Sequence, residues 1–314
     1  MELAYEQCML CPRNCKVNRN AGETGFCGET ANLRLAWAGL HFGEEPPITG
    51  TGGSGAIFVT GCNLGCSFCQ NYQISRDAMG TIVSDTEFLT ICTALQEAGA
   101  ENINIVTGSH AIPAIARMMR TARNKGFSLP FLWNSSSYET VDALRLLDGL
   151  VDCWLPDLKT LNPEIANRFF RAPDYPETAK NALLFMAEHT KNSLMEPAMI
   201  VRHLVLPENL EDTKTVLNWF SKHLKDRALL SLMTQYTPVE KGQTHSTLDQ
   251  PKNRFVSQKE HTTLTRLLEF YDIDDGFLQE LLESSDWLPD FTHTQPFPSS
   301  LAQPIWYWKS GFIR

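Results

Sequence analysis

Residues 56–71 read Ala56-Ile57-Phe58-Val59-Thr60-Gly61-Cys62-Asn63-Leu64-Gly65-Cys66-Ser67-Phe68-Cys69-Gln70-Asn71. The apolar, partly β-branched run at the start of this stretch predicts a buried strand. Three cysteines with C-x3-C-x2-C spacing follow the run directly. In a parallel α/β sheet, the loops at the C-terminal ends of the strands carry the functional groups. The stretch therefore predicts three thiols gathered at the functional edge of a sheet.

Three neighbouring thiolates suit an iron-sulfur cluster or zinc. Structural zinc takes four ligands, and nearby amides such as Asn63 and Gln70 are poor candidates for the fourth. We therefore interpret Cys62, Cys66 and Cys69 as ligands of an iron-sulfur cluster with one iron left open. The alternative is a structural metal knot, or a chance group of reduced thiols.

The cysteine motif, with Phe68 in its aromatic position, resembles the cluster loop of the radical S-adenosylmethionine (SAM) superfamily. Cys69-Gln70-Asn71 resembles the branch of that superfamily that activates glycyl radical enzymes. The resemblance implies a 4Fe-4S cluster on Cys62, Cys66 and Cys69, with SAM chelating the fourth iron and Phe68 beside it. It also implies that one electron cleaves SAM to a 5′-deoxyadenosyl radical, which abstracts hydrogen from a substrate.

Length and composition favour a soluble protein built mainly from one barrel-sized domain. The chain has 314 residues, of which 43% are hydrophobic and 20% charged. It shows no membrane-spanning run, and its first residues lack the basic and apolar regions of a signal peptide. Nine cysteines, mostly clustered, suit metal binding in a reducing compartment. We expect a cytoplasmic protein without a membrane partner.

The formal net charge is −9. Proteins that bind phosphate backbones use faces rich in Lys and Arg. The charge therefore disfavours nucleic acid as a substrate.

A second group of cysteines lies near the N-terminus: Cys8, Cys11, Cys15 and Cys27, with C-x2-C-x3-C-x11-C spacing. The segment is rich in asparagine, proline and glycine and has few apolar residues, so it needs a cross-link or a bound metal to hold its shape. Four thiols can surround one metal centre. We predict a second iron-sulfur cluster or zinc, and a metal-free loop is the alternative.

From residue 56 onward, strand-like and helix-like segments alternate, which predicts a parallel sheet covered by helices. Helices are predicted over 85–99, 111–125, 138–148, 162–171, 176–190, 211–224 and 257–271, and strands over 56–59, 102–107, 129–133, 151–155, 198–206 and 229–236. Six β/α units are too few to close an eight-stranded barrel. We therefore predict an open, partial (β/α)6 barrel of the TIM type, with Cys92 and Cys153 in its core.

Three regions are expected along the chain. Residues 1–50 form a Cys-rich extension, 51–240 the radical SAM partial barrel, and 241–314 a C-terminal helix and tail packed on the barrel. The tail carries aromatic side chains, which we expect to cover an exposed barrel edge or to dock a partner protein. These aromatics are Trp287, Phe291, Phe297, Trp306, Tyr307, Trp308 and Phe312.

Polar residues at the ends of the predicted strands are the candidates for binding SAM. Asp157-Leu158-Lys159 resembles the Asp-Leu-Lys of the activases, and residues two apart on a strand face the same way. The Gly-Gly-Glu stretch of activases has no counterpart after the second strand, which leaves Thr107, Ser109 or backbone carbonyls for the amino group of SAM. Asn134 is a further candidate for binding ribose, Arg202 and His203 are candidates for binding carboxylate or adenine, and a helix cap is the competing role.

Motifs along nearly the whole chain resemble proteins described as pyruvate formate-lyase activating enzyme-like. The leading hypothesis is a radical SAM oxidoreductase that acts on a protein or peptide, in its sharpest form by abstracting hydrogen from a glycine Cα. A flavodoxin- or ferredoxin-type protein would donate the electron. The alternatives are a radical SAM enzyme with a small-molecule substrate and a non-catalytic iron-sulfur electron carrier or metal-binding protein.

Overall fold

The computed structural model describes residues 3–190, 193–240, 246–281 and 288–313, so Trp287 lies outside the described residues. The strands are β1 (Arg34–His41), β2 (Ser54–Val59), β3 (Thr81–Ile82), β4 (Ile103–Val106), β5 (Phe131–Ser135), β6 (Cys153–Pro156), β7 (Ile200–Leu204), β8 (Leu229–Met233), β9 (Gly276–Leu278), β10 (Ala302–Tyr307) and β11 (Gly311–Phe312). One sheet has the order β11-β10-β1-β2-β4-β5-β6 with β3 paired to β1, and a second has the order β7-β8-β9.

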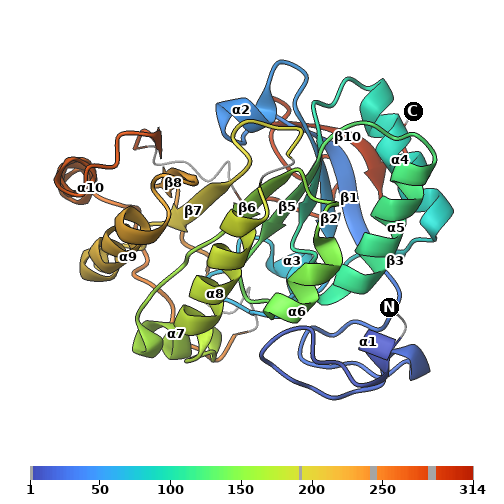
Figure 1. The fold of residues 1–314 in the computed structure, drawn as a ribbon, viewed down its shortest axis with the longest axis horizontal. Coiled ribbons are helices and arrows are strands. Elements are labelled where there is room, and N and C mark those ends of the chain that lie inside the picture. Colours follow the sequence, from blue (N-terminus) through green and yellow to red (C-terminus); the bar gives the residue numbers. More distant parts are fainter. Residues whose placement is uncertain (1–2, 191–192, 241–245, 282–287, 314) are drawn as a thin grey trace.

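Helices follow most of the parallel strands and cover their outer side (Figure 1). They are α1 (Leu3–Glu6), α2 (Pro46–Thr49), α3 (Tyr72–Ser75), α4 (Asp85–Glu97), α5 (Ile112–Asn124), α6 (Val141–Leu144), α7 (Pro163–Phe170), α8 (Tyr175–Glu188), α9 (Leu210–His223) and α10 (Gln258–Phe270), with 3-10 turns η1 (Arg19–Ala21), η2 (Ser109–Ala111) and η3 (Arg145–Leu147). Along the outer side α4 contacts α5, α5 contacts α6, and α6 contacts α8.

The parallel strands form an open, curved wall, which confirms the predicted partial barrel. β2, β4, β5 and β6 pair in parallel, as do β7, β8 and β9. Two isolated parallel bridges, Trp154↔Met199 and Asp157↔Arg202, join β6 to β7. Among the described residues no strand pairing closes the wall into a full barrel.

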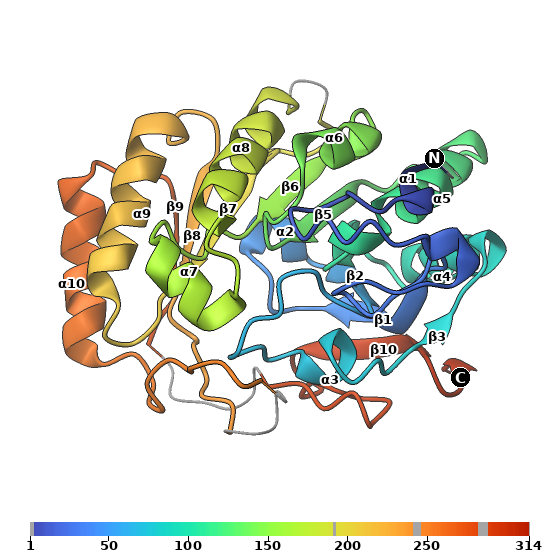
Figure 2. The same cartoon turned by 90° about the horizontal axis from the view of Figure 1, so that it is seen from below.

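Antiparallel strands extend the wall beyond β2, and the two longest of them, β1 and β10, come from opposite ends of the chain. β1 pairs with β2 on one side and with β10 on the other. Figure 2 shows β10 beside β1, with α3 close to it. The aromatic tail therefore contributes a strand to the sheet itself. Its aromatic residues Phe291 and Phe297 pack with Trp37 and Phe58 in a second apolar cluster.

Local sequence signals explain several helix boundaries. Ser84 begins α4 through a capping box, because its Oγ accepts from the Glu87 amide at 3.2 Å while the Glu87 carboxylate accepts from the Ser84 amide at 2.8 Å. The predicted helix 138–148 is wrong in its extent. Thr140 caps a four-residue α6, which passes into η3 and ends before Gly149, whose φ is +69°.

The residues before β1 are mostly irregular and pack against η2 and the loop after β2. Arg19 is 1% exposed, and its guanidinium donates to the carbonyls of Glu29, Thr30 and His110. Burial, together with the nearby Arg19 charge, lowers the pKa of His110 to about 3, so this histidine is neutral. Within the described residues no helix is long and apolar enough to cross a membrane.

Candidate functional site

The cysteine loop leaves the C-terminal end of β2, as the sequence predicts. Gly61 and Gly65 have φ values of +88° and +73°, a backbone conformation that favours glycine, and they bend the loop around its thiols. Cys62, Cys66 and Cys69 all line one cavity, and Phe68 lines it with them. Burial raises the pKa of the Cys66 and Cys69 thiols, and the Lys159 ammonium opposes this shift in both.

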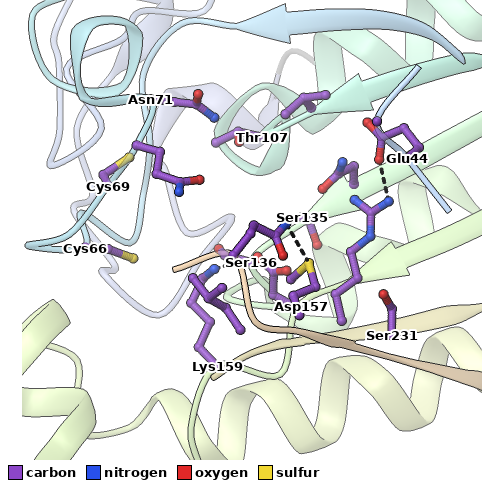
Figure 3. A pocket seen from close by; sticks show the side chains of 18 of the residues that line it. Glu44, Cys66, Cys69, Asn71, Thr107, Ser135, Ser136, Asp157, Lys159 and Ser231 are labelled. Atoms are coloured by element: carbon purple, nitrogen blue, oxygen red, sulfur yellow. Dashed lines mark hydrogen bonds and ion pairs between the residues drawn. The ribbon is translucent and has the colours of Figure 1, made fainter. Parts of the chain in front are cut away.

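Asp157 and Lys159 lie at the end of β6 and line the same cavity as the three cysteines. The Lys159 Nζ is 2.5 Å from the Asp157 Oδ2, so the predicted ion pair is present. Figure 3 labels both residues in the cavity. Burial disfavours the charge of Lys159, but the Asp157 carboxylate and the nearby Cys66 outweigh it and raise the pKa of Lys159. The Tyr175 hydroxyl fixes this turn, since it accepts from the Lys159 amide at 2.9 Å and donates to the Asp157 carbonyl at 3.1 Å.

The ends of β4 and β5 supply uncharged polar groups to the cavity. Thr107 and Asn134 line it, and the Thr107 amide donates to the Asn134 carbonyl at 2.9 Å. Thr107 has a φ of +64°, which is uncommon for a residue with a side chain and marks a constrained turn. Ser135 and Ser136 lie beside them, as Figure 3 shows.

Two predicted SAM contacts lie elsewhere. Ser109 is buried in η2 and donates to the Glu139 carboxylate at 2.7 Å. The His203 ring uses both nitrogens inside the protein, one with the Leu158 carbonyl at 2.7 Å and the other with the Thr213 hydroxyl at 3.0 Å. His203 points away from the cavity because side chains alternate along a strand, and its neighbours on β7 line the cavity instead.

The floor of the cavity is a charged cluster, of which the sequence singled out only Arg202. Arg202 of β7 donates from Nε to the Glu45 Oε1 at 2.9 Å, and from Nη2 to the Glu44 Oε2 at 2.5 Å. Burial disfavours the charged forms of Arg202 and Glu45. The attraction between the two charges outweighs this effect, so the pKa of Glu45 is lowered and the pKa of Arg202 is raised. Two carboxylates and one guanidinium leave one net negative charge. Ser231 also lines the floor.

The rest of this floor is visible in the sequence only as the acidic pair Glu44-Glu45 before two prolines. Its partner Arg202 is 157 residues from Glu45 along the chain. Pairing over such a separation follows from the tertiary fold and has no local pattern.

The cavity suits a cofactor with polar groups. Its volume is about 500 Å³, within the range of small-molecule sites. Three buried polar atoms on lining residues have no partner in the described protein: the Gln70 Nε2, the Ser136 Oγ and the Gln235 Oε1. Together with the three thiols, these residues fit a 4Fe-4S cluster and SAM. No three His, Cys, Asp or Glu side chains of the described residues already stand in a metal-binding arrangement.

The other cysteines lie outside the cavity. Cys8, Cys11 and Cys27 are close enough to interact electrostatically, and the Cys15 Sγ accepts from the Phe26 amide at 3.4 Å. Cys92 and Cys153 are fully buried in apolar clusters, as predicted. None of the described cysteines forms a disulfide.

Comparison with protein families identifies this arrangement. The family model described as the Radical SAM superfamily matches residues 56–220, more than half of the 314-residue chain. The chain belongs to the radical SAM superfamily. An uncharacterised protein of Methanocaldococcus jannaschii is 30% identical over 279 residues, which cover 86% of this chain and 76% of that protein.

Two solved structures share the radical SAM fold at low sequence identity. A radical SAM methyltransferase from Sphaerobacter thermophilus aligns with a TM-score of 0.50 and 14% identity, covering 74% of this chain and 67% of its own. The FeFe-hydrogenase maturase HydG from Carboxydothermus hydrogenoformans aligns with a TM-score of 0.51 and 13% identity, covering 72% of this chain and 52% of its own. The superfamily implies a 4Fe-4S cluster and SAM in the cavity. The family model describes the superfamily as a whole and does not distinguish the activase branch.

Proposed function

We propose that this radical SAM enzyme cleaves SAM in the cavity and abstracts a hydrogen atom from a substrate bound in the same cavity. The main support for this proposal is that Cys62, Cys66 and Cys69 line the same cavity as the Asp157–Lys159 ion pair. With a cluster and SAM bound, one electron splits the sulfonium and gives a 5′-deoxyadenosyl radical. The chain's own residues must then bind, orient and shield these groups.

Each part of the cavity wall has a role suited to its chemistry. The three thiolates hold three irons. Lys159 is a half-buried cation beside Cys66 and would offer its charge to the SAM carboxylate, while Asp157 would accept hydrogen bonds from the amino group or the ribose. Asn134 and Thr107 contribute uncharged polar contacts, and Phe68 gives an apolar surface.

The first candidate substrate is a protein or peptide, with hydrogen taken from a glycine Cα. Its support is the resemblance of Cys69-Gln70-Asn71 and Asp157-Leu158-Lys159 to activase motifs. A cavity of about 500 Å³ that also holds SAM admits a single narrow segment and no folded domain. A glycine segment suits this limit because it carries no side chain.

A second candidate is a small polar molecule, and two features of the cavity favour it. Phe297 of the tail lines the cavity, so the tail covers part of the side through which a large substrate would enter. The floor of Glu44, Glu45 and Arg202 carries one net negative charge, which suits a substrate with an amino group or other hydrogen-bond donors.

Deuterium transfer distinguishes the two candidates. Reconstituted enzyme, SAM and dithionite would be incubated with the protein fraction or the small-molecule fraction of an extract from D₂O-grown cells of the organism that encodes it. Deuterium in 5′-deoxyadenosine from the protein fraction alone supports the first candidate, and from the small-molecule fraction alone the second. SAM cleavage with deuterium from neither fraction would contradict hydrogen abstraction from either class.

We propose a flavodoxin- or ferredoxin-type protein as the electron donor, docking where the cysteine loop reaches the surface. The half-buried Arg76 covers Gly65 and lies 4.8 Å from the centroid of the Phe26 ring, which is 37% exposed. A cation and an aromatic ring next to the loop suit an acidic donor. Arg76→Glu should slow cluster reduction by flavodoxin and leave reduction by dithionite unchanged, and equal slowing by both reductants would refute the docking site.

A further inference from the structure

The residues before β1 have little regular structure, yet they fold into two tight loops that carry four cysteines. In the first loop the Cys8 amide donates to the Val17 carbonyl at 3.0 Å, and the Lys16 amide donates to the Cys8 carbonyl at 3.0 Å. In the second loop the Gly28 amide donates to the Gly25 carbonyl at 3.1 Å. The first loop thus holds Cys8, Cys11 and Cys15, and the second holds Cys27.

The two loops bring their sulfur atoms toward one another. Cys8, Cys11 and Cys27 lie within electrostatic reach of each other. Cys15 packs against the second loop so closely that a Cβ at Gly25 would lie 2.7 Å from its Sγ. Its sulfur also accepts a hydrogen bond of 3.4 Å from the amide of Phe26, the residue before Cys27. All four thiols are free and half-buried.

We propose that Cys8, Cys11, Cys15 and Cys27 bind one metal centre through four thiolates, either Zn²⁺ or an iron-sulfur cluster. Four thiolates fill a tetrahedral site and leave no open position, so the centre is structural. Binding of Zn²⁺, or of a cluster that is already assembled, converts four thiols to thiolates and releases their protons, with no change in the oxidation state of the metal. The thiols do not yet stand in a metal-binding arrangement, and the same holds for Cys62, Cys66 and Cys69 in the described chain.

The centre would have a specific task, because Arg13 lies between two of its ligands. The Arg13 guanidinium donates to the carbonyls of Asn63 at 3.0 Å and Leu64 at 2.9 Å in the cysteine loop. It also donates to the carbonyls of Phe170 at 2.7 Å and Arg171 at 2.6 Å, at the C-terminal end of α7. Arg13 therefore ties the cysteine loop to α7.

The contacts also fix the side on which the centre lies. The Cys27 carbonyl is 3.0 Å from the position of a Cβ on Gly61, so the second loop packs directly against the start of the cysteine loop. None of the four N-terminal cysteines lines the cavity. A metal here supports the cysteine loop from the side away from the substrate and cannot bind the substrate itself.

The triple variant Cys62→Ala/Cys66→Ala/Cys69→Ala cannot bind a cluster in the cysteine loop. Its metal content therefore tests the N-terminal site alone. After anaerobic treatment with zinc or with iron and sulfide, we expect about one zinc or about four irons per chain. Additional Cys11→Ala and Cys15→Ala substitutions should abolish this metal, and Cys92→Ala should keep it. A folded triple variant that retains no stoichiometric metal would overturn the proposal, whatever the wild type does with SAM.

Arg13→Gln tests the supporting role, because it leaves all four cysteines in place. We expect the N-terminal metal to stay while a chelator removes iron from the loop cluster several-fold faster than in the wild type. Arg168→Gln, which loses an exposed pair with Asp249, is the matched control and should match the wild type. Unchanged iron loss in Arg13→Gln would contradict the supporting role.

Discussion

Asp157 and Lys159 are the charged residues of the cavity wall nearest to the cysteine loop. Their ion pair is partly buried, with side-chain exposures of 21% and 18%, so water screens it less than a fully exposed pair. The pair is suited to binding the zwitterionic end of SAM because each of its charges has a counterpart there.

Replacing Asp157 with Asn should weaken SAM binding by roughly tenfold, because a charge-assisted hydrogen bond becomes a neutral one. Calorimetric titration of SAM into the reconstituted protein measures this change. The control is Asp142→Asn. Asp142 also forms an ion pair, with Arg145, but its side chain is 86% exposed. If both variants bind SAM as the wild type does, Asp157 is only a rim residue.

At the residue scale, the sequence identified which residues lie at strand ends, but it did not show which of their side chains face the cavity. Asp157 and Lys159 reach the cavity because they are two apart and follow β6 directly. Arg202 and His203 are adjacent on β7, so only one of them can face inward, and the sequence does not show which. Burial of Arg202 among two carboxylates from a distant loop settles the choice.

At the element scale, the tail is held by apolar contacts inside the wall. Phe291 is fully buried, and the centroid of its ring lies 5.4 Å from that of Phe58. The Tyr307 hydroxyl donates to the Thr292 carbonyl at 2.8 Å and ties the tail to β10. The tail is thus part of the folded domain.

Phe291→Ala should lower the free energy of unfolding by about 3 kcal/mol, because the cavity it leaves adds to the lost burial. Phe312→Ala, from the same tail but at a ring that is 44% exposed, should change it by less than about 1 kcal/mol. Denaturant unfolding of both variants measures the difference. Equal effects would mean that the tail does not pack as described.

A capping box fixes the start of α10 and makes its stability depend on pH. Hydrogen bonds from Arg254, together with the Ser257 and Glu208 amides, lower the pKa of Glu260 to about 2, although burial opposes the shift. A carboxyl whose pKa is lowered on folding stabilises the protein above its unfolded pKa, and this contribution is lost as the pH falls toward the folded value.

Glu260→Gln should therefore cost roughly 1–2 kcal/mol at neutral pH, since the partly exposed Arg254 pair is weakened by solvent. The difference from the wild type should shrink as the pH falls from about 4.5 toward 2. Thermal melts across this range provide the measurement. A difference that stays constant with pH would show that the carboxylate charge contributes nothing.

Some elements were predictable from local pattern and others were not. The periodic helices α4, α5, α9 and α10 match the predicted ranges within a few residues, because each carries an apolar stripe and a boundary signal. β10 was missed because its sequence Ala-Gln-Pro-Ile-Trp-Tyr contains a proline and lacks alternation. Pairing with β1 makes it a strand, and Pro304 is tolerated because the outer strand β11 pairs only with Trp306 and Tyr307.

At the scale of the whole molecule, segments far apart in the sequence meet to form one cavity. The cysteine loop and the ends of β4, β5 and β6 form one end, while Glu44, Glu45 and Arg202 form the floor. The motif Cys-x3-Cys-x2-Cys predicted the cofactor end because all its ligands lie on one loop. The floor depends on contacts between β7 and the segment before α2, which only the folded chain brings together.

Formation of 5′-deoxyadenosine is the most direct test of the assignment to SAM cleavage. Anaerobically reconstituted wild type, SAM and dithionite should produce it, while Cys66→Ser should fall to the assay background, because a hydroxyl is a poor ligand for cluster iron. Cys92→Ala, which removes a thiol from the core instead, should retain activity. Cleavage by Cys66→Ser at the wild-type rate, or none by the reconstituted wild type, would contradict the account.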